Sequence, residues 1–351
     1  MGSLILALNG GSSSLKYGAF IVGADVCEAV VRGSAPGPAD HAALFAEIDA
    51  KLHGARPDAV GHRIVHGGPG LFAPVVVDAQ VTATLKAASA FAPLHGPAAL
   101  ALIAGAKRHY AVPQVACFDT GFHQHMPEIA AVLPVPKSLR DLGVRRYGFH
   151  GLACQSIVRQ LGGSLPERLV IAHLGSGASV TACRAGRSVD TSMGLTPSGG
   201  VVMATRSGDL DPGLLLFLLR ERGMSPDALE DLVDRRSGLF GLSGLSGDLR
   251  QLRETYGGEP DARLAIAAFC RSVAKQIAAM IVSLGGIDML VFSGGIGEHD
   301  PATRAAICAD LGWAGIPPDG QERLGVCVML LQAEEEEQIA REVSTLDALA
   351  F

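Results

Sequence analysis

Two stretches of the chain, half its length apart, share one pattern. Residues 3–20 read SLILALNGGSSSLKYGAF, and residues 168–184 read RLVIAHLGSGASVTACR. Each is an apolar run, a short turn of glycine and serine, and a second strand-like run. A strand–turn–strand unit that recurs at such a distance indicates two related halves. The length of 351 residues suits two domains.

Three further apolar runs also end in turns rich in glycine or polar residues. They are AVGHRIVHGGPG, QVACFDTGFH and DMLVFSGGIGE, and long alanine- and leucine-rich helical segments separate them. Strands that alternate with helices predict an α/β protein. We place a first domain at residues 1–143 and a second at 144–332, with a closing helix over 333–351 that joins the first domain.

Composition excludes several classes of function. The net charge is −6, aromatic residues make up 5%, and no basic block occurs, so nucleic acid is not an expected partner. No apolar run reads as long enough to cross a membrane, and the N-terminal residues lack a signal-peptide pattern. Seven cysteines without CxxC spacing indicate reduced thiols rather than disulfides or zinc. We therefore expect a cytoplasmic protein.

The first glycine–serine turn has two interpretations. It is not a Walker A loop, because Leu15 rather than glycine precedes Lys16. Its glycines still allow backbone N–H groups to approach a phosphate closely, and its serines and lysine add donors. A hairpin without any ligand is the alternative, and the stretch alone does not decide between them.

Charged residues stand where other strands end. Arg63, next to apolar neighbours, suits a small anion with an apolar tail, although an ordinary surface arginine reads the same way. Asp119 follows an apolar strand, where α/β proteins usually bind ligands, although a turn or cap role is the alternative. Together with glycine-rich turns after strands, these residues fit nucleotide-dependent phosphoryl transfer.

The order of the motifs resembles the acetate kinase family. Eleven segments follow that family from residue 9 to residue 342: NGGSSSLKY, GHRIVHGG, APLHGP, FDTGFHQHMP, RRYGFHG, HLGSGAS, DTSMGLTP, TRSGDLDP, GDLR, FSGGIGE and EEEEQIARE. The resemblance implies a duplicated two-domain actin-like (ribonuclease H-like) α/β fold, with the active site in the interdomain cleft, and a homodimer.

The implied reaction is reversible transfer of the γ-phosphoryl group of ATP to a short-chain carboxylate, with Mg²⁺ or alternatively Mn²⁺. Acetate is the first expectation, propionate the alternative. By position, the resemblance makes Asp119, His150 and Arg206 catalytic. It gives the metal to Asn9 and Glu335, with Glu336 as the alternative. Carboxylate binding falls to Arg63, Val65, Leu94, Phe149 and Pro197. ATP or ADP contacts fall to Lys16, His173, Leu174, Gly175, Ser176, Gly177, Asp248, Leu249, Arg250, Gly294, Gly295, Ile296, Gly297 and Glu298.

The sequence departs from the family at two motif positions: Gly96 and Ser176 stand where the family usually has asparagine. Two other functions are alternatives to the carboxylate kinase. A sugar kinase of the same fold needs many neutral polar groups, whereas Arg63 with apolar neighbours suits a carboxylate. A non-catalytic nucleotide sensor would keep the ATP-binding turns but lose one or more of four residues, and all four are present: Arg63, Asp119, His150 and Arg206.

Overall fold

The computed structural model describes residues 2–11, 14–24, 26–37, 40–255, 257–317 and 325–346. The chain divides into two compact units. The first comprises residues 1–124, 149–160 and 334–351, and the second comprises residues 125–148 and 161–333. The sequence-based boundary at 143/144 differs from this division in two segments: residues 125–143 belong to the second unit, and residues 149–160 belong to the first. The backbone explains part of this difference, because Gly151 N donates to Asp119 O at 2.8 Å and ties residue 151 to the first unit.

The first unit is a six-stranded sheet with helices on both faces. Its strand order is β3-β2-β1-β4-β6-β5. The strands are β1 (Ser3–Gly10), β2 (Ser14–Val22), β3 (Cys27–Pro36), β4 (Ala59–Ile64), β5 (Val75–Val76) and β6 (Gln114–Phe118). The helices are α1 (His41–Lys51), α2 (Ala79–Ala88), α3 (Gly96–His109), α6 (Gly151–Leu161) and α14 (Glu335–Ser344), with short 3₁₀ turns η1 (Ser89–Phe91) and η2 (Gly121–His123).

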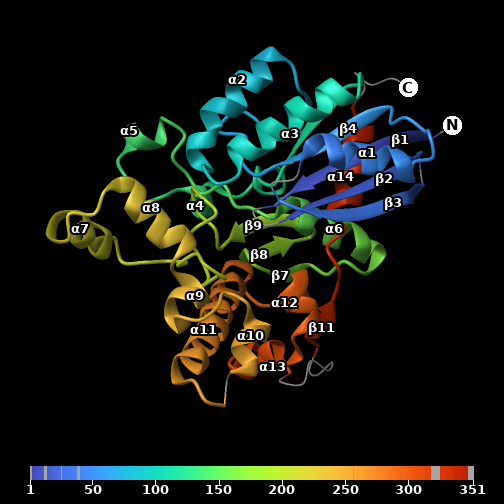
Figure 1. The fold of residues 1–351 in the computed structure, drawn as a ribbon. Helices are drawn as coiled ribbons and strands as arrows, with labels where there is room; N and C mark the ends of the chain where they lie inside the picture. The colour runs from blue at the N-terminus through green and yellow to red at the C-terminus, as the bar shows by residue number, and fades with distance from the viewer. Residues whose placement is uncertain are drawn as a thin grey trace. The chain divides into compact units, whose positions relative to one another are not determined.

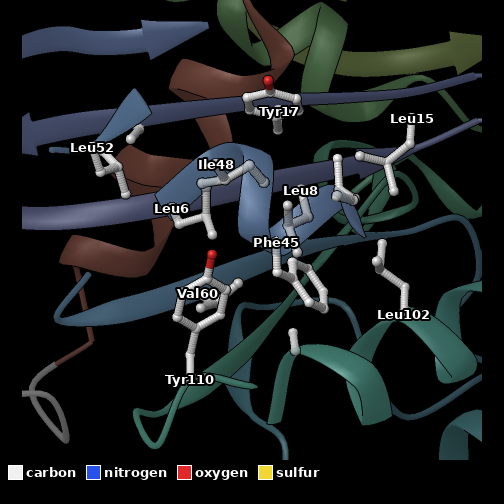
Figure 2. Packing of buried hydrophobic residues seen from close by; sticks show 13 residues of the cluster. Leu6, Leu8, Leu15, Tyr17, Phe45, Ile48, Leu52, Val60, Leu102 and Tyr110 are labelled. Atoms are coloured by element: carbon white, nitrogen blue, oxygen red, sulfur yellow. The ribbon is translucent and has the colours of Figure 1, made fainter. Parts of the chain in front are cut away.

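Side-chain alternation along β1 separates two cores. Leu6 and Leu8 point to one face, where they pack with Phe45 of α1 and Leu102 of α3, as Figure 2 shows. Ile5 and its neighbour Ala7 point to the other face, where α14 lies. Because both faces are covered, β1 is apolar throughout rather than alternating. The C-terminal helix α14 thus lies against the N-terminal strands (Figure 1).

The second unit has a five-stranded sheet of order β11-β10-β7-β8-β9. The strands are β7 (Arg168–Leu174), β8 (Ala178–Arg184), β9 (Arg187–Thr191), β10 (Met289–Ser293) and β11 (Cys327–Leu330). The helices are α4 (Glu128–Ala131), α5 (Lys137–Arg140), α7 (Pro212–Glu221), α8 (Pro226–Arg235), α9 (Gly238–Ser243), α10 (Leu249–Glu254), α11 (Pro260–Leu284), α12 (Gly294–His299) and α13 (Pro301–Ala309), with 3₁₀ turns η3 (Gly162–Ser164) and η4 (Gly312–Ala314).

The two sheets share one topology. In each, three consecutive strands form an antiparallel meander, β1-β2-β3 in one unit and β7-β8-β9 in the other. The first strand of each meander then pairs in parallel with a later strand, β4 or β10, which pairs in parallel with another, β6 or β11. The repeated sequence pattern therefore corresponds to a repeated fold.

Helix α11 corrects one expectation from the sequence. Within the described residues it is the one helix whose length and composition would allow it to cross a membrane. The sequence analysis had expected no apolar run of that length. In the structure α11 packs against β7, β8, α9 and α13, and residues such as Phe269 and Ile277 are buried. Its place is that of a core helix, with Gly285 in the left-handed region at its C-terminus.

Candidate active site

Three polar side chains meet where β1, β4 and β6 of the first unit end. Arg63 forms a bidentate contact with Asp119: Nε donates to Oδ1 at 3.0 Å, and Nη2 donates to Oδ2 at 2.6 Å. A third nitrogen, Nη1, donates to Asn9 Oδ1 at 3.1 Å. The parallel pairing of β1 with β4 and of β4 with β6 places these residues at neighbouring strand ends. The sequence singled out all three, and the structure brings them together.

The glutamate run at the start of α14 completes this cluster. Asn9 Nδ2 donates to Glu335 Oε2 and to Glu336 Oε1, both at 2.7 Å. Arg63 Nη1 also lies 4.0 Å from Glu335 Oε2. The structure thus places both candidate glutamates of the sequence analysis beside Asn9. We call Asn9, Arg63, Asp119, Glu335 and Glu336 the polar cluster.

The two outer glutamates of the run have a different role. Arg159 of α6 contacts Glu334 at 2.6 Å and Glu337 at 3.1 Å. Residues three apart lie on one face of a helix, so Arg159 fixes that face of the first turn of α14, while Glu335 and Glu336 contact Asn9. Arg159 is a positioning residue that the sequence analysis did not name, because it lies outside the family motifs.

Burial and charge act together on the central ion pair. Burial raises the pKa of Asp119, and the contact with Arg63 opposes that rise. Burial alone would lower the pKa of Arg63, but the charges of Asp119 and Glu335 outweigh it and raise the pKa. The side chains are 14% and 1% exposed for Arg63 and Asp119. Arg63 and Asp119 therefore form a desolvated ion pair, in which removal of either side chain would leave the other as an unpaired buried charge.

His150 follows in a strained turn of the same unit. Its φ of 57° lies in the left-handed region, which is rare for a residue with a side chain. The next residue must be glycine, because a Cβ on Gly151 would lie 2.2 Å from Asp119 O. Nε2 of the buried His123 lies 3.0 Å from Phe149 O. Burial lowers the pKa of His123 to about 4, so its neutral ring donates N–H to that carbonyl. His123 thus anchors the predicted catalytic turn.

The other predicted residues of the first unit lie around the cluster. Lys16 is the cross-strand partner of Asn9 in the β1–β2 ladder, so both share one face, and its side chain is exposed. Phe149 packs against His66, with ring centroids 5.6 Å apart, and Val65 is buried. Leu94 lines a cavity together with Arg63 of the cluster.

The departure at Gly96 has a steric reason. A Cβ there would lie 2.4 Å from Ser89 Oγ and 3.0 Å from Ser89 Cα. Turn η1 therefore occupies the space that a side chain at this position would need, and the sequence could not show this contact between two adjacent helices.

In the second unit, Arg206 and Pro197 are neighbours: Arg206 Nη1 donates to Pro197 O at 3.2 Å. The β7–β8 turn, which includes Gly175 and Ser176, closes with a bond from Gly175 N to Gly177 O at 3.0 Å. His173 and Leu174 end β7. These predicted nucleotide-contacting residues offer mainly backbone groups.

Two more predicted nucleotide segments follow. Gly294 N donates to Glu298 Oε1 at 2.9 Å at the start of α12, which also carries Gly295, Ile296 and Gly297. Asp248 caps α10 and pairs with the exposed Arg250 at 2.7 Å, while Leu249 is buried.

The polar cluster offers the donor type that Mg²⁺ prefers. That ion is usually held by one or two carboxylates together with substrate phosphates and water. Glu335 and Glu336 present carboxylate oxygens beside the amide of Asn9. In the part of the chain that the structure describes, no group of three or more His, Cys, Asp or Glu side chains could hold a metal. The residues fit a divalent cation that takes further ligands from a nucleotide.

The fold and the charged strand ends define a two-unit α/β protein with a buried ionic cluster in its first unit. Comparison with known proteins identifies its family: residues 41–341 match the model of the acetokinase family, to which the chain belongs. A curated acetate kinase of Rhodopseudomonas palustris (strain ATCC BAA-98 / CGA009) is 39% identical, covering 91% of this chain and 89% of that protein. One of Deinococcus deserti is 44% identical, covering 91% and 88%.

Solved structures agree with this assignment. A propionate kinase of Francisella tularensis has a TM-score of 0.88 at 32% identity, covering 97% of this chain and 98% of that one. An acetate kinase of Porphyromonas gingivalis has a TM-score of 0.83 at 31% identity, covering 98% and 99%. The predicted family and the predicted duplicated two-domain actin-like fold are confirmed.

Proposed function

We propose that this protein transfers the γ-phosphoryl group of ATP to acetate, forming acetyl phosphate and ADP. Membership of the acetokinase family supports a kinase with a carboxylate acceptor. The observation that carries the proposal is the buried polar cluster, in which Arg63 and Asn9 stand among three carboxylates at the strand ends.

The chemistry asks for positioning and charge neutralisation. The acceptor is already a carboxylate at neutral pH, so no strong general base is needed. One of its oxygens forms the bond to the γ-phosphorus while the bond from that phosphorus to the β–γ bridging oxygen breaks. The electron pair of the broken bond leaves with ADP, and no proton is released. We assign direct in-line transfer without a phosphorylated enzyme.

In this proposal each charged side chain has a separate task. Arg63 offsets the repulsion between two anions, and Asp119 fixes the guanidinium rather than accepting a proton. His150 donates to a phosphoryl oxygen in the transition state, and Arg206 adds positive charge there. These roles come from the resemblance and from the chemistry of the side chains.

Asn9, Glu335 and Glu336 would hold Mg²⁺. When bound, the ion neutralises phosphate charge and orients the nucleotide. Lys16, across the ladder from Asn9, would contribute a further positive charge.

The preference between acetate and propionate depends on one methylene group in an apolar pocket, which is worth about 1–3 kcal/mol. The relatives that are named acetate kinases support acetate as the substrate, whereas the Francisella tularensis structure is that of a propionate kinase. The resemblance places Val65 and Phe149 in that pocket, and both are buried.

The test is ATP-dependent formation of acyl phosphate, trapped as the hydroxamate, with formate, acetate, propionate and butyrate. We expect the highest kcat/KM with acetate and inversion at a chiral γ-phosphorus. Activity with none of the four acids would overturn the proposed reaction. Retention at phosphorus, or a phosphorylated residue on the productive path, would overturn direct transfer.

We also infer a homodimer in the cytoplasm that needs neither a membrane nor nucleic acid. The resemblance supports the dimer, and α7 supports it further. This helix carries Leu214, Leu216 and Phe217 exposed at 42–47%. A second copy of this chain is the occupant that we assign to this apolar surface. Sedimentation velocity measures the resulting mass.

A further inference from the structure

The loop of the second unit that carries Arg206 lies between β9 and α7. Its ends close on each other, because Gly200 N donates to Asp209 Oδ1 at 2.7 Å and Asp209 N donates to Gly200 O at 3.0 Å. Residues 201–208, between these ends, belong to no helix or strand. Irregular backbone has no ladder of hydrogen bonds to fix it, so the position of Arg206 depends on contacts with other segments.

The end of α8 supplies contacts on both sides of Arg206. Immediately before it, Thr205 Oγ1 donates to Asp234 O at 2.8 Å. Immediately after it, Ser207 N donates to Val233 O at 2.9 Å. Two consecutive residues of α8 therefore hold the two chain neighbours of Arg206, and a shift of this helix end would move the arginine with it.

The backbone of Arg206 itself lies against the start of α9. Gly238 there has φ +62°, and a Cβ on it would lie 2.7 Å from Arg206 O. Leu239 N donates to Met203 O at 2.8 Å, and Met203 N donates to Arg206 O at 3.1 Å. The loop is thus packed backbone against backbone on the junction of α8 and α9.

The carboxyl group of Asp234 acts on the other end of the arginine, its guanidinium. Ser198 Oγ donates to Asp234 Oδ1. The residue before Ser198 is Pro197, whose carbonyl oxygen accepts from Arg206 Nη1 at 3.2 Å. Asp234 is 8% exposed, so little water competes for its contact with Ser198. One residue therefore holds both the backbone beside Arg206 and the segment that accepts from its guanidinium.

We propose that Asp234 is a positioning residue for Arg206. The inference rests on the proposed function, in which Arg206 adds positive charge to the phosphoryl group in the transition state. A misplacement of about 1 Å at a catalytic group can cost about 10²-fold in rate, so the contacts of Asp234 should appear in kcat. Asp234 itself acts only through Ser198 and Thr205.

The first test compares Asp234→Ala with Asp234→Asn in the hydroxamate assay at saturating acetate and ATP. We expect Asp234→Ala to lower kcat about 10- to 100-fold. Asp234→Asn keeps an oxygen that accepts from Ser198, so kcat should stay within about threefold. Glu230→Ala, at an exposed position of the same helix, is the matched control and should keep kcat unchanged. Equal losses in Asp234→Ala and Asp234→Asn would overturn the role of the hydrogen bond.

Ser198→Ala makes the same comparison from the other partner of that bond, and it serves if Asp234→Ala does not fold. The variant removes one hydroxyl group at a half-buried position. We expect kcat to fall about 3- to 10-fold, the value of one net hydrogen bond. An unchanged kcat in Ser198→Ala would overturn the path from Asp234 to the guanidinium.

The Arg206→Ala background separates positioning from a general effect on the fold. If Asp234 acts through Arg206, neither Asp234→Ala nor Ser198→Ala should lower kcat further by more than about twofold once the arginine is absent. Losses as large as those in the unaltered chain would overturn the proposal, because the effect would then be independent of Arg206.

A spectroscopic measurement keeps the positioning role apart from the proposed function. In protein labelled with ¹⁵N-arginine, the Nε–H signal of Arg206 is assigned by its absence in Arg206→Lys. We expect this signal to shift in Asp234→Ala and in Ser198→Ala and to stay in place in Glu230→Ala. A signal that stays in place in all three would overturn the positioning role. A shift in a protein whose unaltered chain forms no acyl phosphate would overturn the proposed function and leave the positioning of Arg206 standing.

Discussion

The two hairpins that repeat in this protein share one topology but differ in the contacts that their turns make. The β1–β2 hairpin of the first unit ends beside side chains: Asn9 meets Arg63 and the glutamates of α14. The turn of the β7–β8 hairpin in the second unit makes backbone hydrogen bonds instead. Gly175 N donates to Gly177 O, and Ser176 O accepts from Ala204 N at 3.2 Å. One half therefore concentrates charge, and the other brings chain segments close together.

The second half depends on the close approach of backbones. Gly294, at the end of β10, has φ +77°, and a Cβ there would lie 2.6 Å from Leu174 O. The adjoining Gly295 has open space around it. The two halves should consequently lose stability and activity for different reasons. The first is sensitive to the removal of a charged side chain, and the second to the addition of one methyl group at a glycine.

The largest effect should come from Arg63→Ala. The substitution leaves Asp119 buried without its partner, which costs about 3–5 kcal/mol of unfolding free energy. We expect kcat/KM for acetate to fall at least about 10³-fold, because the cluster loses its cation. Urea unfolding and the hydroxamate assay measure the two effects.

Lys137→Ala is the matched control for stability. Lys137 forms a pair with Asp141 at 2.7 Å, close to the 2.6 Å of Arg63 and Asp119, but both of its side chains are more than half exposed. Exposed pairs contribute little, so unfolding should hardly change. If the two variants unfold alike, the polar cluster is not the desolvated ion pair that its burial indicates.

Gly294→Ala should have the next largest effect. The added methyl group meets Leu174 O and forces a strained φ, so we expect a loss of about 2–4 kcal/mol. The KM for ATP should rise more than kcat falls, because the distortion lies in a predicted nucleotide segment. Gly295→Ala is the stability control, and equal destabilisation by both would contradict the steric argument.

The sequence predicted the parts of this comparison that depend on local pattern. The apolar runs, the glycine–serine turns and the family motifs were enough to predict the duplicated topology and to name all five residues of the polar cluster. Contacts between distant segments were not predictable: Arg159 beside Glu334, and His123 beside Phe149 O, join residues whose own motifs carry no such information. The steric reason for Gly96 likewise needed coordinates, because it depends on the path of η1.

The smallest effect concerns a carboxyl group behind the first hairpin. Burial raises the pKa of Glu342 on α14 to about 7, against an ordinary value of 4.5, although Cys117 and Gln338 oppose this by hydrogen bonding. Between those two values the folded state binds more protons than the unfolded state. Stability therefore falls as the pH rises from about 4.5 to about 7, and then levels off.

Glu342→Gln removes this group and keeps its shape. We expect the variant to gain about 1–2 kcal/mol over the unaltered chain at pH 8 and nothing near pH 4.5. Urea unfolding at a series of pH values measures the difference. Glu230→Gln, at an exposed position of α8, should show no such pH-dependent gain. If the difference in unfolding free energy between Glu342→Gln and the unaltered chain does not change with pH, the carboxyl group ionises normally. The effect of burial on charged groups in the first unit is then confined to the polar cluster.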